Sequence, residues 1–421
     1  MLNKNKIMIL CKVVDNFGDI GVVYRLARAL TDLRPELELT LVVSNLESFH
    51  AMAKEIEAKK QIQDFHYKNS VWKILDWNLE VENGKLKTEN SDFPLSTFHS
   101  QLILECFQCG RPDWLEDILF APDFTDTVQI IQIDYLTAED YADEFHLLKS
   151  GTRKSNIKKI FFMPGFTEKT GGLIINEECR MQNAEFGASC LRQAGLSDVP
   201  LTLHCSPRFA HSATASPHLQ SLARDFSLFF FAYEDDCAVV VKGIADFQEK
   251  MREKDKNFSV CVYLASGKSC APFEGSWKKL GSPFKIEKLP FMQQEEFDEF
   301  ITRMDFLFVR GEDSLARAAL TGLPFVWQAY KQDENYQLVK VKALLERMRP
   351  YFGEEVFKDI QDFYQSYNDY ENPAKAVPLT KMLLASAKNE NTEGFKDFSE
   401  KLIQNGNLAC HLLDFIDALQ A

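Results

Sequence analysis

The sequence predicts an α/β fold with two parallel-sheet units. Short apolar runs, typical of buried parallel strands, alternate with amphipathic helical stretches, and this alternation occurs twice along the chain. A stretch containing one proline and three glycines at 164–172 separates the two series and predicts a flexible linker. With 421 residues, 45 % hydrophobic residues and 34 phenylalanines, the chain is long enough for two or three domains with large cores.

The first series of elements predicts one α/β domain. Its strands are predicted at 6–13, 38–44, 101–105, 128–134 and 158–162. Its helices are predicted at 21–33, 46–58, 113–119 and 139–148. Hydrophobic strands separated by helices imply a parallel sheet that is covered on both faces.

The second series repeats the pattern. Its strands are predicted at 226–231, 259–265, 284–289, 305–309 and 324–327. Its helices are predicted at 237–250, 294–303, 315–321 and 335–346, and an amphipathic stretch at 395–419 is expected to break at 405–407. Two such units joined by a linker form a cleft, which is where small-ligand sites tend to occur. The stretch 205–222 resembles an exposed loop.

Charge and cysteine content exclude several classes of protein. The net charge of −14 argues against broad binding to nucleic acid or to an anionic membrane, and favours a basic partner or simply a solvated acidic surface. No apolar run approaches the roughly 18 residues of a membrane span. The ten cysteines show no disulfide-like spacing, and the single C-x-x-C pair at 106–109 lacks further zinc ligands. We expect reduced thiols, no metal site and a cytoplasmic protein.

Two carboxylates, Asp15 and Asp19, lie in the loop that follows the apolar run 7–10. A loop at the end of a parallel strand lies where open α/β sheets bind ligands. Two acids would repel an anionic phosphate, so the loop is suited to a cation or to proton abstraction. We predict Asp19 as a general base and Asp15 as a clamp on a cationic acceptor.

Neighbouring residues of this loop favour the ligand-binding interpretation. Gly18 and Gly21 allow a ligand to approach the backbone closely, and we include Phe17 with them as a predicted substrate contact. A purely structural interpretation also stays open. In it, Asn16 caps the following helix and Asp19 interacts favourably with the helix dipole.

A second group of polar residues, Arg310 to Ser314, follows a strand of the second unit. Free amides at the start of the next helix form an anion site, and Arg310 can add a forked contact to phosphate. Glu312 is suited to accept a hydrogen bond from a sugar hydroxyl. The alternative is structural, with Ser314 as a helix cap and Arg310 paired to Glu312.

Aromatic residues follow two further strands of the second unit. Phe291, with the amide of Gln294 nearby, is suited to stack on a nucleobase and bind its edge, although an isolated phenylalanine is more often part of a core. Tyr233 follows the phenylalanine-rich strand in the same way. No two aspartates lie two positions apart, so the Asp-x-Asp pair of metal-dependent sugar-nucleotide enzymes is missing. This favours phosphate neutralisation by amides and arginine.

These motifs, in this order, resemble those of the EarP family of protein-arginine rhamnosyltransferases, which modify bacterial elongation factor P. The similarity spans nearly the whole chain and departs locally near 205–222 and 370–392. The motifs that carry it are 15–22 (DNFGDIGV), 164–173 (PGFTEKTGGL), 310–314 (RGEDS), 324–327 (PFVW) and 332–345.

The resemblance implies a GT-B architecture, in which two Rossmann-like domains face each other across a cleft and the C-terminal helix returns to the N-terminal domain. The implied organisation is an acceptor domain at 1–164, a linker at 165–183, a nucleotide-sugar domain at 184–394 and a helical segment at 395–421. It implies inverting, metal-independent transfer of L-rhamnose from dTDP-β-L-rhamnose to an arginine of elongation factor P. This modification would activate the factor for ribosomes stalled at polyproline, and no cofactor besides the donor is implied.

The resemblance also assigns roles to individual residues. By motif, Asp19 corresponds to the catalytic base and Asp15 to its partner on the guanidinium. The donor site is assigned to Tyr233, Phe291, Gln294, Arg310, Glu312, Asp313 and Ser314. Two alternatives stay open: a nucleotide-sugar epimerase of the same fold, and a non-catalytic protein that binds elongation factor P.

Overall fold

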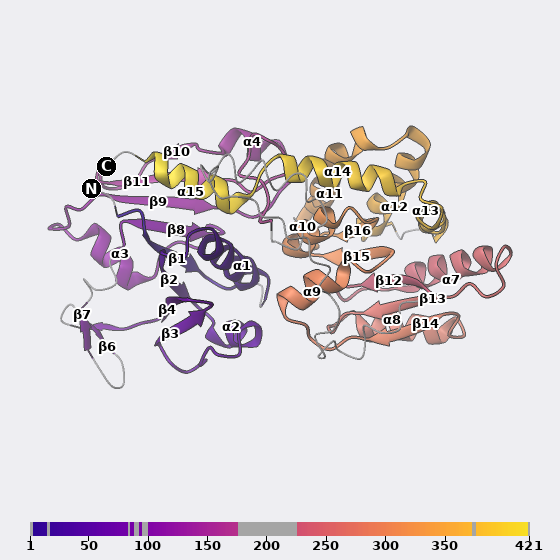
Figure 1. Cartoon of the computed structure of the whole chain (residues 1–421), viewed down its shortest axis with the longest axis horizontal. Helices are drawn as coiled ribbons and strands as arrows, with labels where there is room; N and C mark the ends of the chain where they lie inside the picture. Colours follow the sequence, from indigo (N-terminus) through magenta and orange to yellow (C-terminus); the bar gives the residue numbers. More distant parts are fainter. Residues whose placement is uncertain are drawn as a thin grey trace, which may run out of the picture. The chain divides into compact units, whose positions relative to one another are not determined.

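The computed structural model describes residues 3–14, 17–82, 85–87, 92–94, 100–175, 225–372 and 376–419 (Figure 1). The chain divides into two compact units. The first contains Met1–Met181, Gly311–Leu320 and Glu400–Ala421, and the second contains Gln182–Arg310 and Thr321–Ser399.

The first unit is built on an eight-stranded sheet with the strand order β10-β11-β9-β8-β1-β2-β4-β3. The six inner strands are parallel, and each edge strand pairs antiparallel with its neighbour. The strands are β1 (Lys6–Cys11), β2 (Glu38–Val43), β3 (Ile62–Tyr67), β4 (Ser70–Asp76), β8 (Leu102–Cys106), β9 (Val128–Ile133), β10 (Lys149–Ser150) and β11 (Ile157–Phe162). A separate small antiparallel sheet contains β5 (Val81–Glu82), β6 (Lys85–Lys87) and β7 (Asp92–Pro94).

Helices cover both faces of the large sheet because successive strand residues point to opposite sides. Ile7 and Ile9 pack with α1 (Gly18–Leu33) and α15 (Leu408–Ala418) in one core, whereas Met8 and Leu10 pack with α3 (Asp113–Phe120) in another. The remaining helices of this unit are α2 (Leu46–Met52), α4 (Tyr141–Phe145) and α10 (Glu312–Thr321), whose last residue belongs to the second unit.

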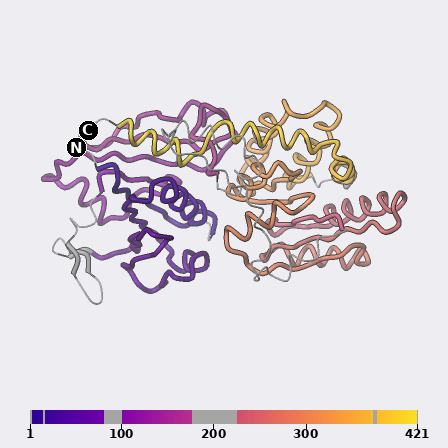
Figure 2. Tube along the Cα trace, viewed as in Figure 1, coloured from indigo at the N-terminus to yellow at the C-terminus, as the bar shows by residue number. Residues whose placement is uncertain are grey.

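The C-terminal helix α15 belongs to the first unit, as the resemblance implies. The two ends of the described chain lie together (Figure 2), where the Lys4 ammonium donates to the Asp417 carbonyl at 2.7 Å. The segment 164–172, predicted as part of a flexible linker, is instead packed in this unit. Phe166 is 5 % exposed, and its carbonyl accepts a hydrogen bond from Asn405 Nδ2 at 2.8 Å.

The second unit is built on a five-stranded, fully parallel sheet with the order β14-β13-β12-β15-β16. Its strands are β12 (Phe226–Phe230), β13 (Val260–Leu264), β14 (Lys285–Lys288), β15 (Phe306–Arg310) and β16 (Phe325–Gln328). Its helices are α7 (Ala238–Arg252), α8 (Cys270–Lys279), α9 (Gln294–Ile301), α11 (Tyr336–Met348), α12 (Glu354–Asn368), α13 (Ala376–Ala387) and α14 (Thr392–Gln404), which ends within the first unit.

All the predicted strands and helices are present in the described residues, although the helix predicted over 46–58 ends at Met52 and the one predicted over 139–148 covers only Tyr141–Phe145. The break predicted at 405–407 separates α14 from α15. The prediction missed the edge strand β10, the β3–β4 hairpin, the small sheet and helices α8, α12 and α13. The loop predicted at 205–222 lies outside the described residues. Within the part of the chain that is described, no helix is long and apolar enough to cross a membrane.

Candidate functional site

Three adjacent parallel strands of the first unit end at the same edge of the sheet. β9, β8 and β1 are neighbours in this order, with Ile133 opposite Cys106 and Glu105 opposite Leu10. The carboxyl ends of parallel strands meet at one edge, so the segments that follow these three strands are close together. This edge carries the first group of candidate residues.

Asp19 lies at this edge, in the first turn of α1. Its side chain is buried, with only 3 % of the residue exposed. One carboxylate oxygen, Oδ2, accepts the Val14 backbone N–H at 2.7 Å, and Oδ1 accepts the Tyr135 hydroxyl at 3.0 Å. The carboxylate therefore bonds back across the loop that precedes its own helix, and to a second loop. It is more than a first-turn acid interacting with the helix dipole.

Tyr135 comes from the segment after β9 and is held from two sides. Its ring stacks on Phe107, which follows β8, with ring centroids 4.6 Å apart and an interplanar angle of 20°. Its backbone N–H donates to Asp134 Oδ1 at 2.8 Å, and Asp134 Oδ2 accepts from Gln108 Nε2 at 2.9 Å. Burial, and then the negative charges of Asp19 and Glu312, raise the pKa of Tyr135 above its ordinary value. The phenol therefore keeps its proton at neutral pH and donates a hydrogen bond to Asp19.

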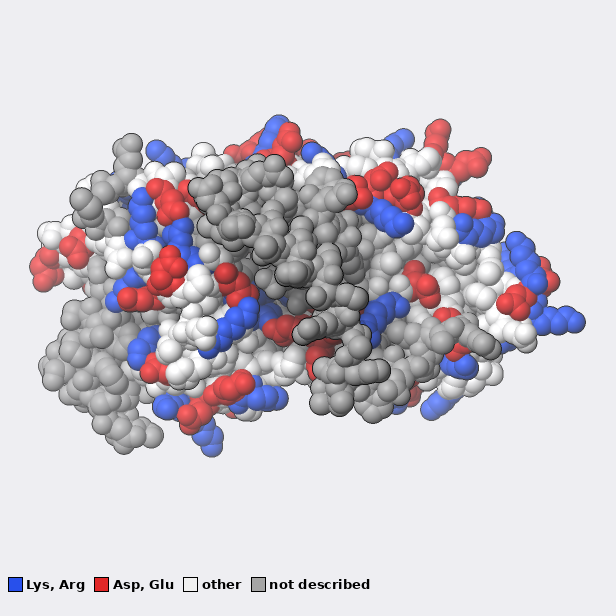
Figure 3. All heavy atoms as spheres, in the orientation of Figure 1, with Lys and Arg blue, Asp and Glu red and all other residues white. Residues whose placement is uncertain are grey.

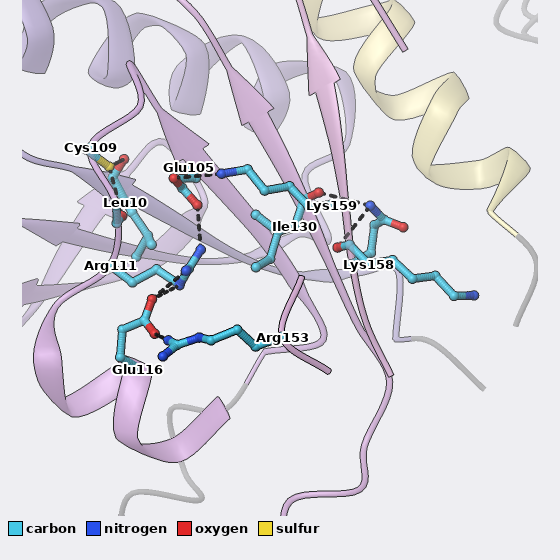
Figure 4. A network of polar contacts seen from close by, with 11 residues as sticks. Leu10, Glu105, Cys109, Arg111, Glu116, Ile130, Arg153, Lys158 and Lys159 are labelled. Atoms are coloured by element: carbon cyan, nitrogen blue, oxygen red, sulfur yellow. Dashed lines mark hydrogen bonds and ion pairs between the residues drawn. The ribbon is translucent and has the colours of Figure 1, made fainter. Parts of the chain in front are cut away.

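An ion-pair network anchors the loop between β8 and α3 (Figure 4). Glu105, which is 3 % exposed, accepts hydrogen bonds from Arg111 Nη1 at 2.7 Å and from Lys159 Nζ at 3.1 Å. Arg111 also donates through Nε to Glu116 of α3 at 2.7 Å. Arg111 follows Phe107 by four residues, so this network holds the far end of the loop that carries Phe107.

A charged cluster ties α10 to α1 within the first unit. Arg25 of α1, only 2 % exposed, donates through Nε and Nη2 to the two carboxylate oxygens of Asp313 at 3.0 and 3.2 Å. Burial alone would raise the pKa of Asp313, but the guanidinium groups of Arg25, Arg317 and Arg28 hold it below its usual range. Arg317 also donates to the carbonyl of Ile174. The Asp313 carboxylate thus has a clear structural role.

The second unit has a strand edge of a different character. Arg310 is the last residue of β15, and its guanidinium carbon lies over the rings of Phe231 at 4.5 Å and Tyr233 at 4.6 Å. Both aromatic residues follow β12, the neighbouring strand. The Tyr233 backbone N–H donates to Gln328 Oε1, at the end of β16, at 2.7 Å. Three adjacent strand ends therefore place a planar cation among aromatic rings.

The other predicted donor-site residues occupy this edge or the start of α10. Phe291 follows β14, is 51 % exposed and is not part of a core, so the core alternative is wrong for it. Gln294 is the first residue of α9, and Glu312 the first of α10. Ser314 lies half-buried in the first turn of α10. Glu312 and Ser314 belong to the first unit with Asp313, and the boundary between the units falls after Arg310.

The predicted acceptor loop is described in part. Phe17 is 44 % exposed, and its carbonyl accepts the Gly21 N–H at 3.0 Å as the first turn of α1 forms. Gly18, the first residue of the helix, is also exposed. Asp15 and the alternative cap Asn16 lie outside the described residues, so their predicted roles stay predictions.

Metal and thiol chemistry find little support in the described residues. No group of three His, Cys, Asp or Glu side chains there is arranged to hold a metal ion. Cys106 is buried, and burial raises the pKa of the Cys109 thiol to about 12. Both thiols of the C-x-x-C pair therefore stay protonated at neutral pH.

The whole chain is similar to one family of enzymes. It matches the family described as elongation factor P (EF-P) rhamnosyltransferase EarP over residues 7–417. The chain belongs to the EarP family. It is 28 % identical to the protein-arginine rhamnosyltransferase of Shewanella oneidensis, over 86 % of this chain and 84 % of that protein. It is 25 % identical to the protein of the same name from Neisseria meningitidis serogroup B, over 98 % of this chain and 97 % of that protein.

A solved structure is described as the structural basis for EarP-mediated arginine glycosylation of translation elongation factor EF-P. It is similar to this chain with a TM-score of 0.50 and 19 % identity, over 98 % of this chain and 99 % of that one. This likeness concerns the fold. The family predicted from the motifs and the two-domain GT-B class are both confirmed.

Sequence reasoning missed Tyr135 and Arg25, the residues that bond Asp19 and Asp313 of this EarP-family chain. One signal for Tyr135 was available. Asp134 and Tyr135 directly follow an apolar strand, as the predicted loop residues do after β1. No comparable signal marks Arg25, which occurs within a helix 288 positions before its partner.

Proposed function

We propose that this protein is an inverting glycosyltransferase that moves L-rhamnose from dTDP-β-L-rhamnose to an arginine side chain of elongation factor P. The observation that carries the proposal is the buried carboxylate of Asp19, held by an amide and a phenol at a parallel-strand edge. Membership of the EarP family supplies the class of reaction and the protein acceptor.

The acceptor half of the reaction needs a base that also holds a cation. A guanidinium stays protonated at any ordinary pH and is a poor nucleophile until a carboxylate binds it. Asp19, with Asp15 as its proposed partner, would bind the arginine through charge-assisted hydrogen bonds and accept a proton as the new bond forms. Phe17 directly precedes α1, and Gly18 and Gly21 lie in its first turn; these three residues are proposed to contact the acceptor.

The donor half needs to stabilise a departing diphosphate. Arg310 offers a planar cation at the end of β15, and the backbone amides at the start of α10, including those of Glu312, Asp313 and Ser314, are proposed as an anion site. Phe291 and Gln294 are proposed to recognise the thymine base, and Tyr233 to contact the donor.

The proposed chemistry is a single displacement. The bond from the arginine nitrogen to the anomeric carbon forms while the bond from that carbon to the diphosphate oxygen breaks. The arginine proton goes to Asp19 and the electron pair leaves with dTDP. Attack from the face opposite the leaving group converts the β-linked donor into an α-linked product, without a covalent enzyme intermediate.

The biological role follows from the acceptor. Rhamnosylation would activate elongation factor P for rescue of ribosomes stalled at polyproline, and translation places the reaction in the cytoplasm. An epimerase would turn over the donor without a protein acceptor. A non-catalytic binding protein would bind the factor without modifying it.

Intact-mass analysis tests these possibilities directly. Purified elongation factor P is incubated with the enzyme and dTDP-β-L-rhamnose, and the expected result is a mass gain of one deoxyhexose, with an α linkage by NMR. The matched control is a factor whose target arginine is replaced by lysine, which should gain no mass. Donor consumed without the factor, or a stable complex without a mass gain, would contradict the proposal.

The same assay tests independence from metals. Because phosphate neutralisation is assigned to Arg310 and helix amides, transfer should be unchanged in excess EDTA. Activity that disappears with the chelator and returns with Mg²⁺ or Mn²⁺ would show that a metal does this work.

A further inference from the structure

The carboxylate plane of Asp19 is held from two directions. Oδ2 accepts the Val14 N–H at 2.7 Å, and Oδ1 accepts the Tyr135 hydroxyl at 3.0 Å. An ionised carboxylate has about four lone-pair positions, two on each oxygen. Two donors from different loops therefore fix the plane of the Asp19 carboxylate and the direction in which it presents its oxygens.

We propose that Tyr135 is a positioning residue of this enzyme, which holds the Asp19 carboxylate in the orientation in which it receives the acceptor guanidinium. The inference rests on the proposed function, in which Asp19 is the base. Tyr135 acts through Asp19 and is assigned no contact with the reacting atoms. Its contribution is pre-organisation, because a base held in the productive direction does not have to be reoriented during the reaction.

The way the Tyr135 ring is held supports this role. One ring face is covered by Phe107, with the centroids 4.6 Å apart. Phe107 and the next residue, Gln108, both have positive φ angles, of 57° and 52°. Residues other than glycine rarely adopt positive φ angles. This backbone conformation persists where the surrounding structure enforces it, often near active sites. Two successive strained residues place the Phe107 ring against Tyr135.

The loop that carries Phe107 is anchored at both ends. At its start, the Phe107 N–H donates to the Ile133 carbonyl at 2.7 Å, and Gln108 bonds Asp134, the residue before Tyr135. At its far end, Arg111 is paired with the buried Glu105 (Figure 4). A network of charged and hydrogen-bonded groups thus holds a single phenol hydroxyl against a single carboxylate.

The charges around Asp19 are consistent with a phenol that donates. Burial, and then the charge of Asp19, raise the pKa of the Tyr135 phenol and of the Cys11 thiol above their ordinary values. Both groups therefore stay protonated and uncharged at neutral pH.

The test is Tyr135→Phe, which keeps the ring and its stacking and removes only the hydroxyl. From the free energy of a hydrogen bond to a charged group, we expect kcat to fall about 10- to 100-fold. The KM for elongation factor P should change less than about threefold. In addition, the acid limb of the kcat–pH profile should move to higher pH, because the ionised base has lost a donor. A residue with a merely structural role would not shift this limb.

The chain offers a matched control. In the same unit, the Tyr67 hydroxyl donates to Asp32 Oδ2 at 3.1 Å, a second tyrosine–aspartate bond at the opposite end of α1 from Asp19. Tyr67→Phe removes an equivalent hydroxyl, and kcat and the pH profile should match the wild type. A second variant, Phe107→Leu, keeps the Tyr135 hydroxyl but removes the stacked ring, and should lower kcat in the same direction by a smaller factor.

The outcomes separate this inference from the proposed function. Wild-type enzyme that fails to modify elongation factor P refutes the function itself. With active wild type, a Tyr135→Phe variant with unchanged kcat and an unmoved acid limb overturns the positioning role. A raised KM with unchanged kcat would instead make Tyr135 a direct acceptor contact, and equal losses in Tyr135→Phe and Tyr67→Phe would indicate a general effect on the fold.

Discussion

The strand edges of the two units carry opposite charges on the same architecture. In the first unit, the loops after β1, β8 and β9 surround a buried carboxylate, Asp19, with an amide and a phenol as donors. In the second unit, the ends of β12, β15 and β16 surround a guanidinium, Arg310, with two aromatic rings. A parallel sheet thus supplies the position of a site, and the loop residues supply its chemistry.

The difference suggests a division of labour between the units. A buried carboxylate is suited to bind a cation and to take a proton from it, whereas an arginine is suited to bind phosphate. If each edge serves one substrate, substitutions at one edge should leave the other substrate unaffected. The predictions below test this separation.

The largest effect is expected from Asp19→Asn. Loss of a general base costs about 10²- to 10⁴-fold in rate, so kcat should fall by that factor. The Kd for dTDP-rhamnose, measured by calorimetry, should stay within about twofold of wild type. Asp32→Asn, in the last turn of the same helix, is the control and should retain full activity. Donor affinity that collapses together with kcat would refute the division of labour.

A large effect on stability is expected from Asp313→Asn. Removing one partner of a buried ion pair costs about 3 kcal/mol, roughly a hundredfold in the folding equilibrium, because Arg25 stays buried without its carboxylate. Urea denaturation of the full chain at pH 7 measures this change. The pKa of Asp313 is lowered in the folded protein, so its stabilisation is present at neutral pH and is lost as pH falls below about 4. The gap between wild type and variant should therefore narrow in acid, and a gap that widens would contradict the assignment.

The ion pair between Asp313 and Arg25 shows what could not be predicted from the sequence. Asp19 was predictable because its motif is local: an apolar strand, a glycine-containing loop and a helix follow one another. The pairing of Asp19 with Tyr135 and of Asp313 with Arg25 was not predictable, because these partners lie 116 and 288 positions apart, although the place of Tyr135 directly after an apolar strand marked it as a strand-end residue. The order of the strands determines which loops meet at one edge of the sheet. The hydrophobic pattern of a single strand does not predict that order.

The same limit applies to the fold. Regular alternation of strand and helix predicted both parallel sheets. It did not predict the antiparallel β3–β4 hairpin, because no helix separates these two strands. Helix α12 has a clear apolar face formed by Phe357, Ile360 and Phe363. The prediction missed this helix, which lies outside the motifs that carry the family resemblance. The segment predicted as a linker at 165–172 packs within the first unit, and its glycines permit close contacts. A Cβ at Gly172 would lie 2.4 Å from the Gly406 carbonyl oxygen.

A more moderate effect is expected from Arg310→Gln. Charge-assisted hydrogen bonds to phosphate predict a rise in the donor Kd of about 10- to 100-fold, while the KM for elongation factor P stays unchanged. Arg310→Lys keeps the charge but loses the planar group that lies over Phe231 and Tyr233, so it should recover the affinity only in part. Arg303→Gln, a half-exposed arginine of the same unit that pairs with Glu299, is the control. A raised acceptor KM in Arg310→Gln would show that this edge serves both substrates.

The smallest effect concerns the charge of the whole protein. The chain carries a net charge of −14, yet acidic and basic side chains are interspersed on the face shown in Figure 3. Attraction between the acidic enzyme and the positively charged target arginine accelerates their encounter more than it tightens the final complex. Salt screens this attraction over about 8 Å at physiological ionic strength. The kcat/KM for elongation factor P should therefore fall by about two- to fivefold as NaCl rises from low to physiological concentration. The donor is anionic and is attracted locally by Arg310, so kcat at saturating acceptor should change little. A steady-state series in NaCl, with each substrate varied separately and sucrose as an uncharged control, measures both quantities. A flat kcat/KM for the acceptor would mean that the acidic surplus is only a solvated surface, and a kcat that falls equally would mean that salt acts on the chemistry at Asp19 or Arg310 instead of on encounter.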